Sequence, residues 1–68
     1  MNRDELIRRA KRLAKVRGLG CRVDEKRGKG SHLTLYFGNR FAVVPGGELK
    51  SGTLASILKQ LGVEKDEI

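Results

Sequence analysis

Residues 3–17 carry an apolar stripe with the period of an α-helix. Asn2 is a good N-cap for this helix, and Glu5, three residues on, completes a capping-box-like pair. Gly18 is expected to end it, because glycine readily takes the left-handed conformation found after helix ends. Apolar side chains recur three and four residues apart and so share one face: Leu6, Ile7, Ala10, Leu13 and Ala14.

Residues 21–25 alternate between apolar and polar side chains and predict a first strand. Cys21 and Val23 are expected to face the core, with Arg22 and Asp24 on the outer side. Cys21 is then a small buried apolar residue rather than a nucleophile. The next five residues, 26–30, hold two glycines and three cations and predict a turn.

Residues 33–37 alternate in the same way and predict a second strand. Leu33, Leu35 and Phe37 are expected to face the helices. Thr34 and Tyr36 belong to the other face, and the same alternation puts residue 32 on that side or at its rim.

A hairpin around residues 38–39 is expected to join this strand to a third, residues 40–44. A two-residue loop pairs Phe37 with Arg40 and puts Phe41 on the face of Tyr36. A three-residue loop, 38–40, pairs Phe37 with Phe41 and Leu35 with Val43. We favour the three-residue loop, with a bulge at its tip, because it keeps the apolar side chains on one face.

The last third of the chain predicts a second helix. Pro45 ends the third strand, and Ser51 is the preferred N-cap, with Thr53 the less favoured alternative. Gly62 is the expected stop, and Val63 the apolar contact that accompanies such a stop. Residues 63–68 are expected to form a charged, frayed tail. The apolar stripe of the helix comprises Leu54, Ile57, Leu58 and Leu61.

The order helix, three strands, helix predicts one α+β domain over residues 1–68. Two amphipathic helices and a sheet with one apolar face form a two-layer α-β-β-β-α sandwich, with both helices on the same face. The opposite face of the sheet is expected to carry few large apolar residues and to be open to solvent or to a partner.

Charge narrows the possible partners. Fifteen Lys and Arg stand against eight Asp and Glu, a formal net charge of +7. A small basic domain of this kind usually binds nucleic acid, an acidic protein or an anionic surface. The first helix is either a solvated basic face or a surface for phosphates or an acidic partner; its cations are Arg3, Arg8, Arg9, Lys11, Arg12, Lys15 and Arg17.

Several classes of chemistry are excluded. A single cysteine allows no internal disulfide and no zinc cluster, and no apolar run has the length of a membrane helix. We expect a cytoplasmic protein without metal or cofactor. Asp24 and Glu25 are adjacent in a strand, so their side chains point to opposite faces and do not form a carboxylate pair. Ser31 and His32 diverge in the same way, which argues against a Ser-His nucleophile pair there. The stretch 28–31 lacks the spacing of a phosphate loop and precedes a strand rather than a helix.

His32, the only histidine, stands among cations at the start of a strand. A single histidine among cations is enough for one reaction, the cleavage of RNA by its own 2′-hydroxyl. His32 is suited to be the general base. Lys29 and the backbone N–H groups near Gly30 and Ser31 are suited to stabilise the anionic transition state. The alternative is that His32 is an ordinary exposed polar residue.

Three stretches together resemble the HicA family of bacterial toxins: residues 28–32 (Gly-Lys-Gly-Ser-His), the strand end at 43–45 (Val-Val-Pro) and residues 49–62. The resemblance runs from the first helix to Gly62. It implies a metal-independent mRNA interferase with a fold like that of double-stranded-RNA-binding domains, silenced by a HicB-like antitoxin. It also implies that His32 is catalytic and that Gly30 and Ser31 match the family's neighbouring residues. Many members carry a basic or histidine-bearing segment after the Val-Pro pair, whereas this chain has Gly46-Gly47-Glu48.

The sequence thus predicts an endoribonuclease toxin acting on mRNA. Two alternatives remain, a non-catalytic RNA-binding module and a protein-interaction module that docks an acidic partner through the basic helix. His32 distinguishes the endoribonuclease from the non-catalytic RNA-binding module, since a protein that only binds RNA does not need it. The residues expected to bind RNA are Lys26, Arg27, Lys29, Gly30 and Ser31.

Overall fold

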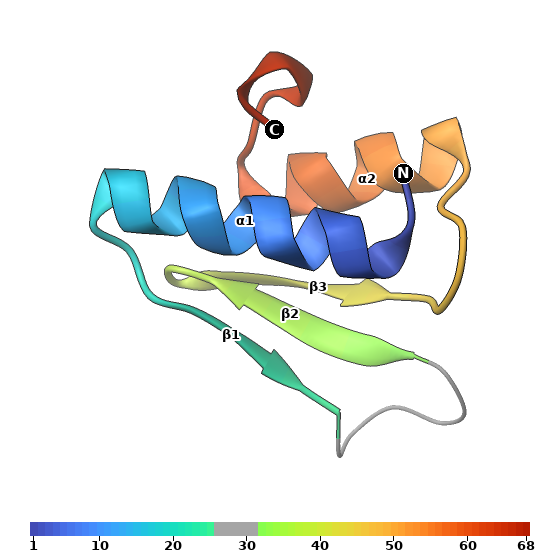
Figure 1. The fold of residues 1–68 in the computed structure, drawn as a ribbon, viewed down its shortest axis with the longest axis horizontal. Helices are drawn as coiled ribbons and strands as arrows, with labels where there is room; N and C mark the ends of the chain where they lie inside the picture. Colours follow the sequence, from blue (N-terminus) through green and yellow to red (C-terminus); the bar gives the residue numbers. More distant parts are fainter. Residues whose placement is uncertain (26–31) are drawn as a thin grey trace.

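The computed structural model describes residues 1–25 and 32–68 and contains the expected helices and strands. They follow one another as helix, three strands, helix (Figure 1), so the predicted α+β architecture is confirmed. The elements are α1 (Arg3–Arg17), β1 (Cys21–Asp24), β2 (Leu33–Phe37), β3 (Arg40–Val44), α2 (Ser51–Leu61) and a short 3₁₀ helix, η1 (Lys65–Glu67).

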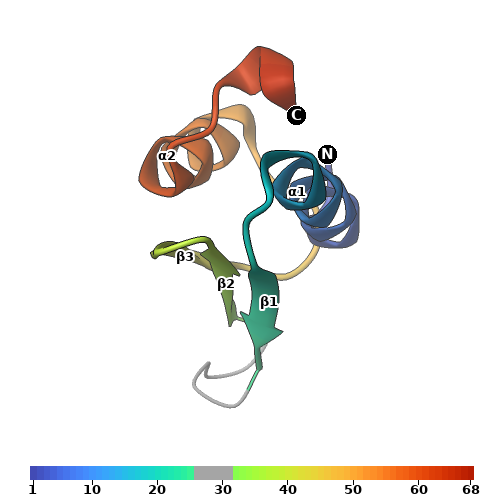
Figure 2. The same ribbon diagram turned by 90° about the vertical axis from the view of Figure 1, so that its left-hand side faces the viewer.

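The molecule has two layers. The strands form an antiparallel sheet in the order β1-β2-β3, so β2 lies in the centre. Both helices lie on one face of this sheet, as Figure 2 shows in a view along the layers. α1 contacts β1 and β2, whereas α2 contacts β3. Among the described residues, no helix or strand covers the opposite face (Figures 1 and 2).

The side chains between the layers are almost completely buried. In β2, Leu33, Leu35 and Phe37 are at most 3% exposed, as their alternation predicts. Burial of a large apolar side chain contributes roughly 1.5–3 kcal/mol, so this small core supplies most of the favourable free energy of folding. Its other members are Leu6, Ala10, Ala14, Ala42, Val44, Leu49, Ile57, Leu58, Leu61 and Val63.

α1 begins and ends where the sequence predicts. The side chain of Asn2 accepts a hydrogen bond from the backbone N–H of Glu5 at 2.8 Å. The Glu5 carboxylate does not close the second half of the capping box, because it pairs with Arg9 at 3.1 Å and with Arg8 at 3.8 Å. Gly18 follows the helix with a φ of 69°, in the left-handed region that favours glycine.

The predicted three-residue hairpin loop is wrong. β2 and β3 are joined by two residues, 38–39, and Phe37 pairs with Arg40. Gly38 has a φ of 62° while Asn39 has a negative φ, the pattern of a type II′ turn with glycine in its first position. Such turns match the right-handed twist of the paired strands, so the hairpin needs no bulge.

In this register, β3 turns toward the helices the face that the prediction had placed outside. Leu35 pairs with Ala42, which is completely buried, whereas Phe41 lies opposite Tyr36 and is 60% exposed. The prediction assumed that the larger apolar side chains of β3 face the helices. β3 packs against α2 with Ala42 and Val44, both completely buried, and leaves Phe41 and Val43 outside.

The start of α2 also differs from its prediction. Ser51 is the first helical residue, and Lys50 precedes it as the N-cap without a capping side-chain hydrogen bond. The predicted end is confirmed. Gly62 has a φ of 71°, and Val63 is buried and donates its backbone N–H to the carbonyl of Leu58 at 2.9 Å.

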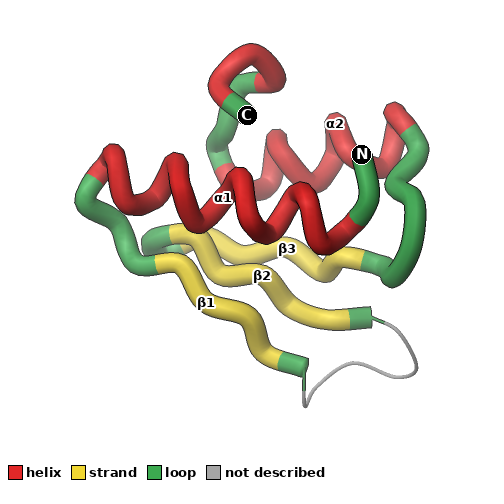
Figure 3. The backbone as a smooth tube through the Cα atoms, in the orientation of Figure 1, coloured by secondary structure: helices red, strands yellow, loops and turns green. Residues whose placement is uncertain are grey.

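The end of the chain has a defined conformation in place of the expected frayed tail. Figure 3 traces it from α2 to the side of the helices away from the sheet. Glu64 and Glu67 form a capping box around η1. Arg17 pairs with Glu67, and Arg9 donates to the carbonyl of Ile68 at 3.0 Å, so two cations of α1 fix this segment.

Candidate functional site

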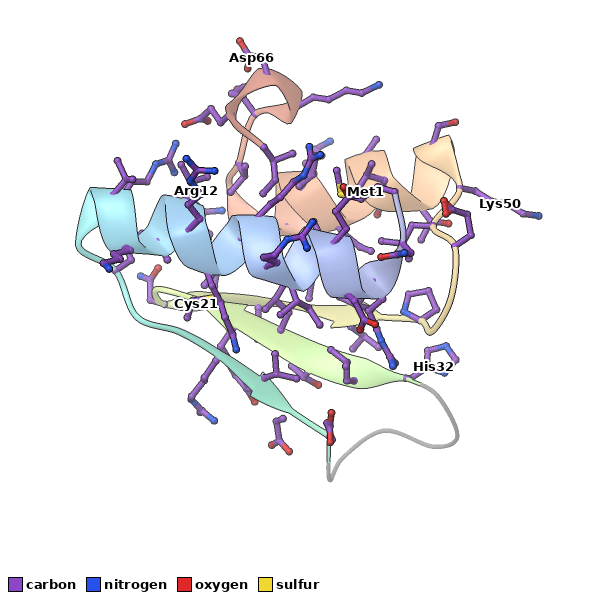
Figure 4. The ribbon with its side chains drawn as sticks, viewed as in Figure 1. Met1, Arg12, Cys21, His32, Lys50 and Asp66 are labelled. Atoms are coloured by element: carbon purple, nitrogen blue, oxygen red, sulfur yellow. The ribbon has the colours of Figure 1, made fainter. Side chains whose placement is uncertain are left out.

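His32 directly precedes β2 and is exposed. Its neighbour Leu33 is buried under the helices, so alternation puts His32 on the side of Thr34 and Tyr36. Figure 4 shows its side chain at the start of β2, clear of the two layers. Within the described chain, His32 forms no hydrogen bond or ion pair. The imidazole is therefore free to contact a molecule from outside, while Leu33 anchors the backbone next to it.

The other residues assigned to this site from the sequence lie outside the described residues. His32 is thus the one predicted site residue that the structure places. Its neighbours remain expectations from sequence: Lys26, Arg27, Lys29, Gly30 and Ser31.

The uncovered face of the sheet carries a row of three side chains, one from each strand. Arg22 pairs with Tyr36, and Tyr36 pairs with Phe41. The guanidinium carbon of Arg22 lies 4.1 Å from the centre of the Tyr36 ring, a cation–π contact. The centres of the Tyr36 and Phe41 rings are 5.9 Å apart, with the rings tilted by 43°. We call Arg22, Tyr36 and Phe41 the aromatic row.

A second row lies between the aromatic row and His32. It consists of Asp24, Thr34 and Val43, paired across the three strands. Val43 is 53% exposed, so the apolar surface continues along β3. His32 precedes Thr34 by two residues and lies at the same end of the sheet, just before β2.

The aromatic row was missed from the sequence because the hairpin register was wrong. The alternation of β2 correctly put Tyr36 on this face, and that of β1 correctly put Arg22 there. The signal that would have added Phe41 is Gly38, since glycine in the first position of a two-residue loop is typical of a type II′ turn.

The basic face of α1 lies on the other side of the molecule. A groove of about 650 Å³ runs between α1 and the C-terminal segment. Arg9 contacts Glu5 and Ile68, whereas Arg12 pairs with no described residue and points away from the sheet (Figure 4). The groove therefore offers cations beside the exposed Val16. Its lining is Arg8, Arg9, Arg12, Leu13, Val16, Glu67 and Ile68.

Cys21 has the structural role expected for it. Its side chain is partly buried and packs against the core. Burial raises the pKa of the Cys21 thiol above its ordinary value, and nearby Lys11 offsets part of that rise. A raised pKa leaves less thiolate near neutral pH, so Cys21 is a poor nucleophile.

Other kinds of site find little support in the described chain. Outside residues 26–31, no three His, Cys, Asp or Glu side chains come together in a way that could hold a metal ion. None of the described helices is long and apolar enough to cross a membrane.

Comparison with known proteins agrees with the resemblance found in the sequence. A family model described as the HicA toxin of bacterial toxin–antitoxin systems matches residues 6–63 of the 68-residue chain. No curated protein and no solved structure matches the chain. The match begins within α1, at residue 6, and ends just after α2, so it includes most of α1, the whole sheet, α2 and His32. The chain therefore belongs to the HicA family, the toxins of bacterial toxin–antitoxin systems.

Proposed function

We propose that this toxin is an endoribonuclease that cleaves mRNA with His32 as general base. The observation that carries the proposal is the position of the single histidine, exposed at the start of β2 in a domain with a net charge of +7. Packing does not explain an imidazole there. A basic surface attracts RNA, whose phosphates carry the opposite charge.

The reaction draws its nucleophile from the substrate. His32 accepts the proton of a ribose 2′-hydroxyl, and the 2′-oxygen attacks the adjacent phosphorus. The bond from phosphorus to the 5′-oxygen then breaks, and that oxygen takes up a proton. The products are a 2′,3′-cyclic phosphate, which hydrolyses to a 3′-phosphate, and a 5′-hydroxyl. General-base catalysis contributes about 10²- to 10⁴-fold to the rate.

The neighbours of His32 in sequence complete this scheme. Lys29 and the backbone N–H groups around Gly30 and Ser31 stabilise the negative charge that develops on the phosphate. Lys26 and Arg27 hold the flanking phosphates. No metal or cofactor takes part in these steps.

The antitoxin partner follows from the family, and we propose that it is a HicB-like protein. Complementarity with the net charge of +7 favours an acidic antitoxin. It silences the toxin in the cytoplasm by covering His32 and the basic surface.

Purified protein incubated with RNA tests the proposal. The parent cleaves the RNA, and His32→Ala slows cleavage by at least about 100-fold because the general base is missing. His32 is exposed and lies outside the core, so the circular dichroism spectrum and unfolding curve of this variant match those of the parent. A variant that cleaves as fast as the parent contradicts the proposal. RNA that is bound but left intact by the parent identifies the chain as a non-catalytic RNA-binding module instead.

A further inference from the structure

The aromatic row is not explained by folding. Phe41 is 60% exposed and Val43 53%, although both alternate along β3 with Ala42 and Val44, which are completely buried. Arg22 and Tyr36 are held together by the cation–π contact at 4.1 Å. Two rings and a guanidinium group therefore stand in line across an open sheet.

We propose that the aromatic row binds unpaired bases of the RNA substrate by stacking. This inference rests on the proposed function and specifies its substrate as single-stranded RNA. The flat faces of aromatic rings and of guanidinium groups are the surfaces on which proteins stack unpaired bases. Of the two rings, Phe41 is exposed and Tyr36 only partly so, and Phe41 therefore offers the first ring to an incoming base.

Charge favours RNA over an apolar protein surface as the occupant. Arg22 belongs to the row itself, and the chain as a whole carries a net charge of +7. Asp24 is the one carboxylate in the neighbouring row of the described residues. A patch that combines cations with exposed rings fits a ligand that combines phosphates with flat bases.

Position links the row to the catalytic residue. Tyr36 and His32 are four residues apart along one strand direction, which is about 13 Å. Stacked nucleotides advance by about 3.4 Å each, so roughly four of them cover this distance. A strand held on Phe41 therefore reaches His32 at the end of β2. Bases within a duplex already stack on each other and are unavailable to Phe41, so the site selects unpaired RNA.

The test measures binding without cleavage, in protein that also carries His32→Ala. The probe is a short unpaired oligoribonucleotide containing 2-aminopurine, whose fluorescence falls when the base stacks. Phe41→Leu keeps an apolar side chain but removes the ring, and we expect it to weaken binding roughly 5- to 150-fold and to abolish the quenching. Phe41→Trp restores both, since it replaces the ring.

Val43→Ala is the matched control, because Val43 is an exposed apolar residue on the same strand and face but has no ring. It changes binding by no more than about twofold. The same RNA annealed into a duplex binds more weakly than the single strand, and Phe41→Leu narrows that difference.

Three results overturn the inference. Phe41→Leu with unchanged affinity and quenching shows that no base stacks there. Val43→Ala with a loss of RNA binding as large as that of Phe41→Leu shows that the affinity does not depend on an aromatic ring. Duplex binding as tight as single-strand binding contradicts the substrate class. In each case, cleavage by the parent and its loss in His32→Ala leave the proposed function standing.

Discussion

The two faces of the sheet are built from the same strands but have opposite surroundings. On the covered face, Leu35 and Ala42 pair under the helices and are completely buried. On the uncovered face, Tyr36 and Phe41 pair one position along, and Phe41 is largely exposed. Apolar side chains on the first face are required by folding, whereas those on the second need another explanation.

This difference separates residues that stabilise the protein from residues that contact its substrate. A covered side chain lowers the free energy of the folded state by leaving water. The exposed ring of Phe41 gains little from folding. It lies beside Tyr36, over whose ring the guanidinium group of Arg22 is placed. Substitutions on the covered face should therefore change the free energy of unfolding, whereas those on the uncovered face should change RNA binding.

The largest effect on stability is expected on the covered face. Leu35→Ala creates a cavity in the core and lowers the free energy of unfolding by about 2–5 kcal/mol. Small domains have only about 5–15 kcal/mol in total, so this variant is close to unfolding. Urea denaturation followed by circular dichroism measures the loss. Val43→Ala, on the uncovered face, changes the same quantity by less than about 1 kcal/mol. Equal losses at both positions would mean that the two faces do not differ in the way described.

A smaller effect on the free energy of unfolding is expected at the N-termini of the two helices. Asn2→Ala removes the hydrogen bond to the backbone N–H of Glu5 and costs about 0.5–2 kcal/mol. Ser51→Ala is the comparison, because Ser51 lies inside α2 and makes no capping bond. Its free energy of unfolding stays within about 0.5 kcal/mol of the parent. A loss at Ser51 as large as that at Asn2 would restore Ser51 as the cap that the sequence predicts.

Local sequence signals predicted most of the fold. The apolar stripes of both helices, the stops at Gly18 and Gly62 and the alternation of β2 each follow from a few adjacent residues. The hairpin register was mispredicted although Gly38 signals a two-residue loop, because the prediction gave more weight to keeping the large apolar side chains of β3 on one face. Ala42 faces the core where β3 packs against α2, and the sequence of β3 alone does not show this contact.

In the candidate site too, local sequence signals predicted some residues and missed those that depend on strand pairing. His32 is visible in sequence as the single histidine within a family motif, and alternation correctly puts it away from the core. Phe41 is missed because its face follows from the register of the hairpin. The aromatic row brings together residues from three strands, so pairing had to be known before Arg22, Tyr36 and Phe41 were seen as one surface.

The most direct test of the central claim is the chemistry of the RNA ends left by the purified toxin. If His32 activates the substrate's own 2′-hydroxyl, mass spectrometry finds 2′,3′-cyclic phosphate or 3′-phosphate on one fragment and a 5′-hydroxyl on the other. A substrate with a single 2′-deoxyribose at the cut position then stays intact there. Fragments with a 3′-hydroxyl and a 5′-phosphate, or cleavage at the deoxyribose, would contradict the account.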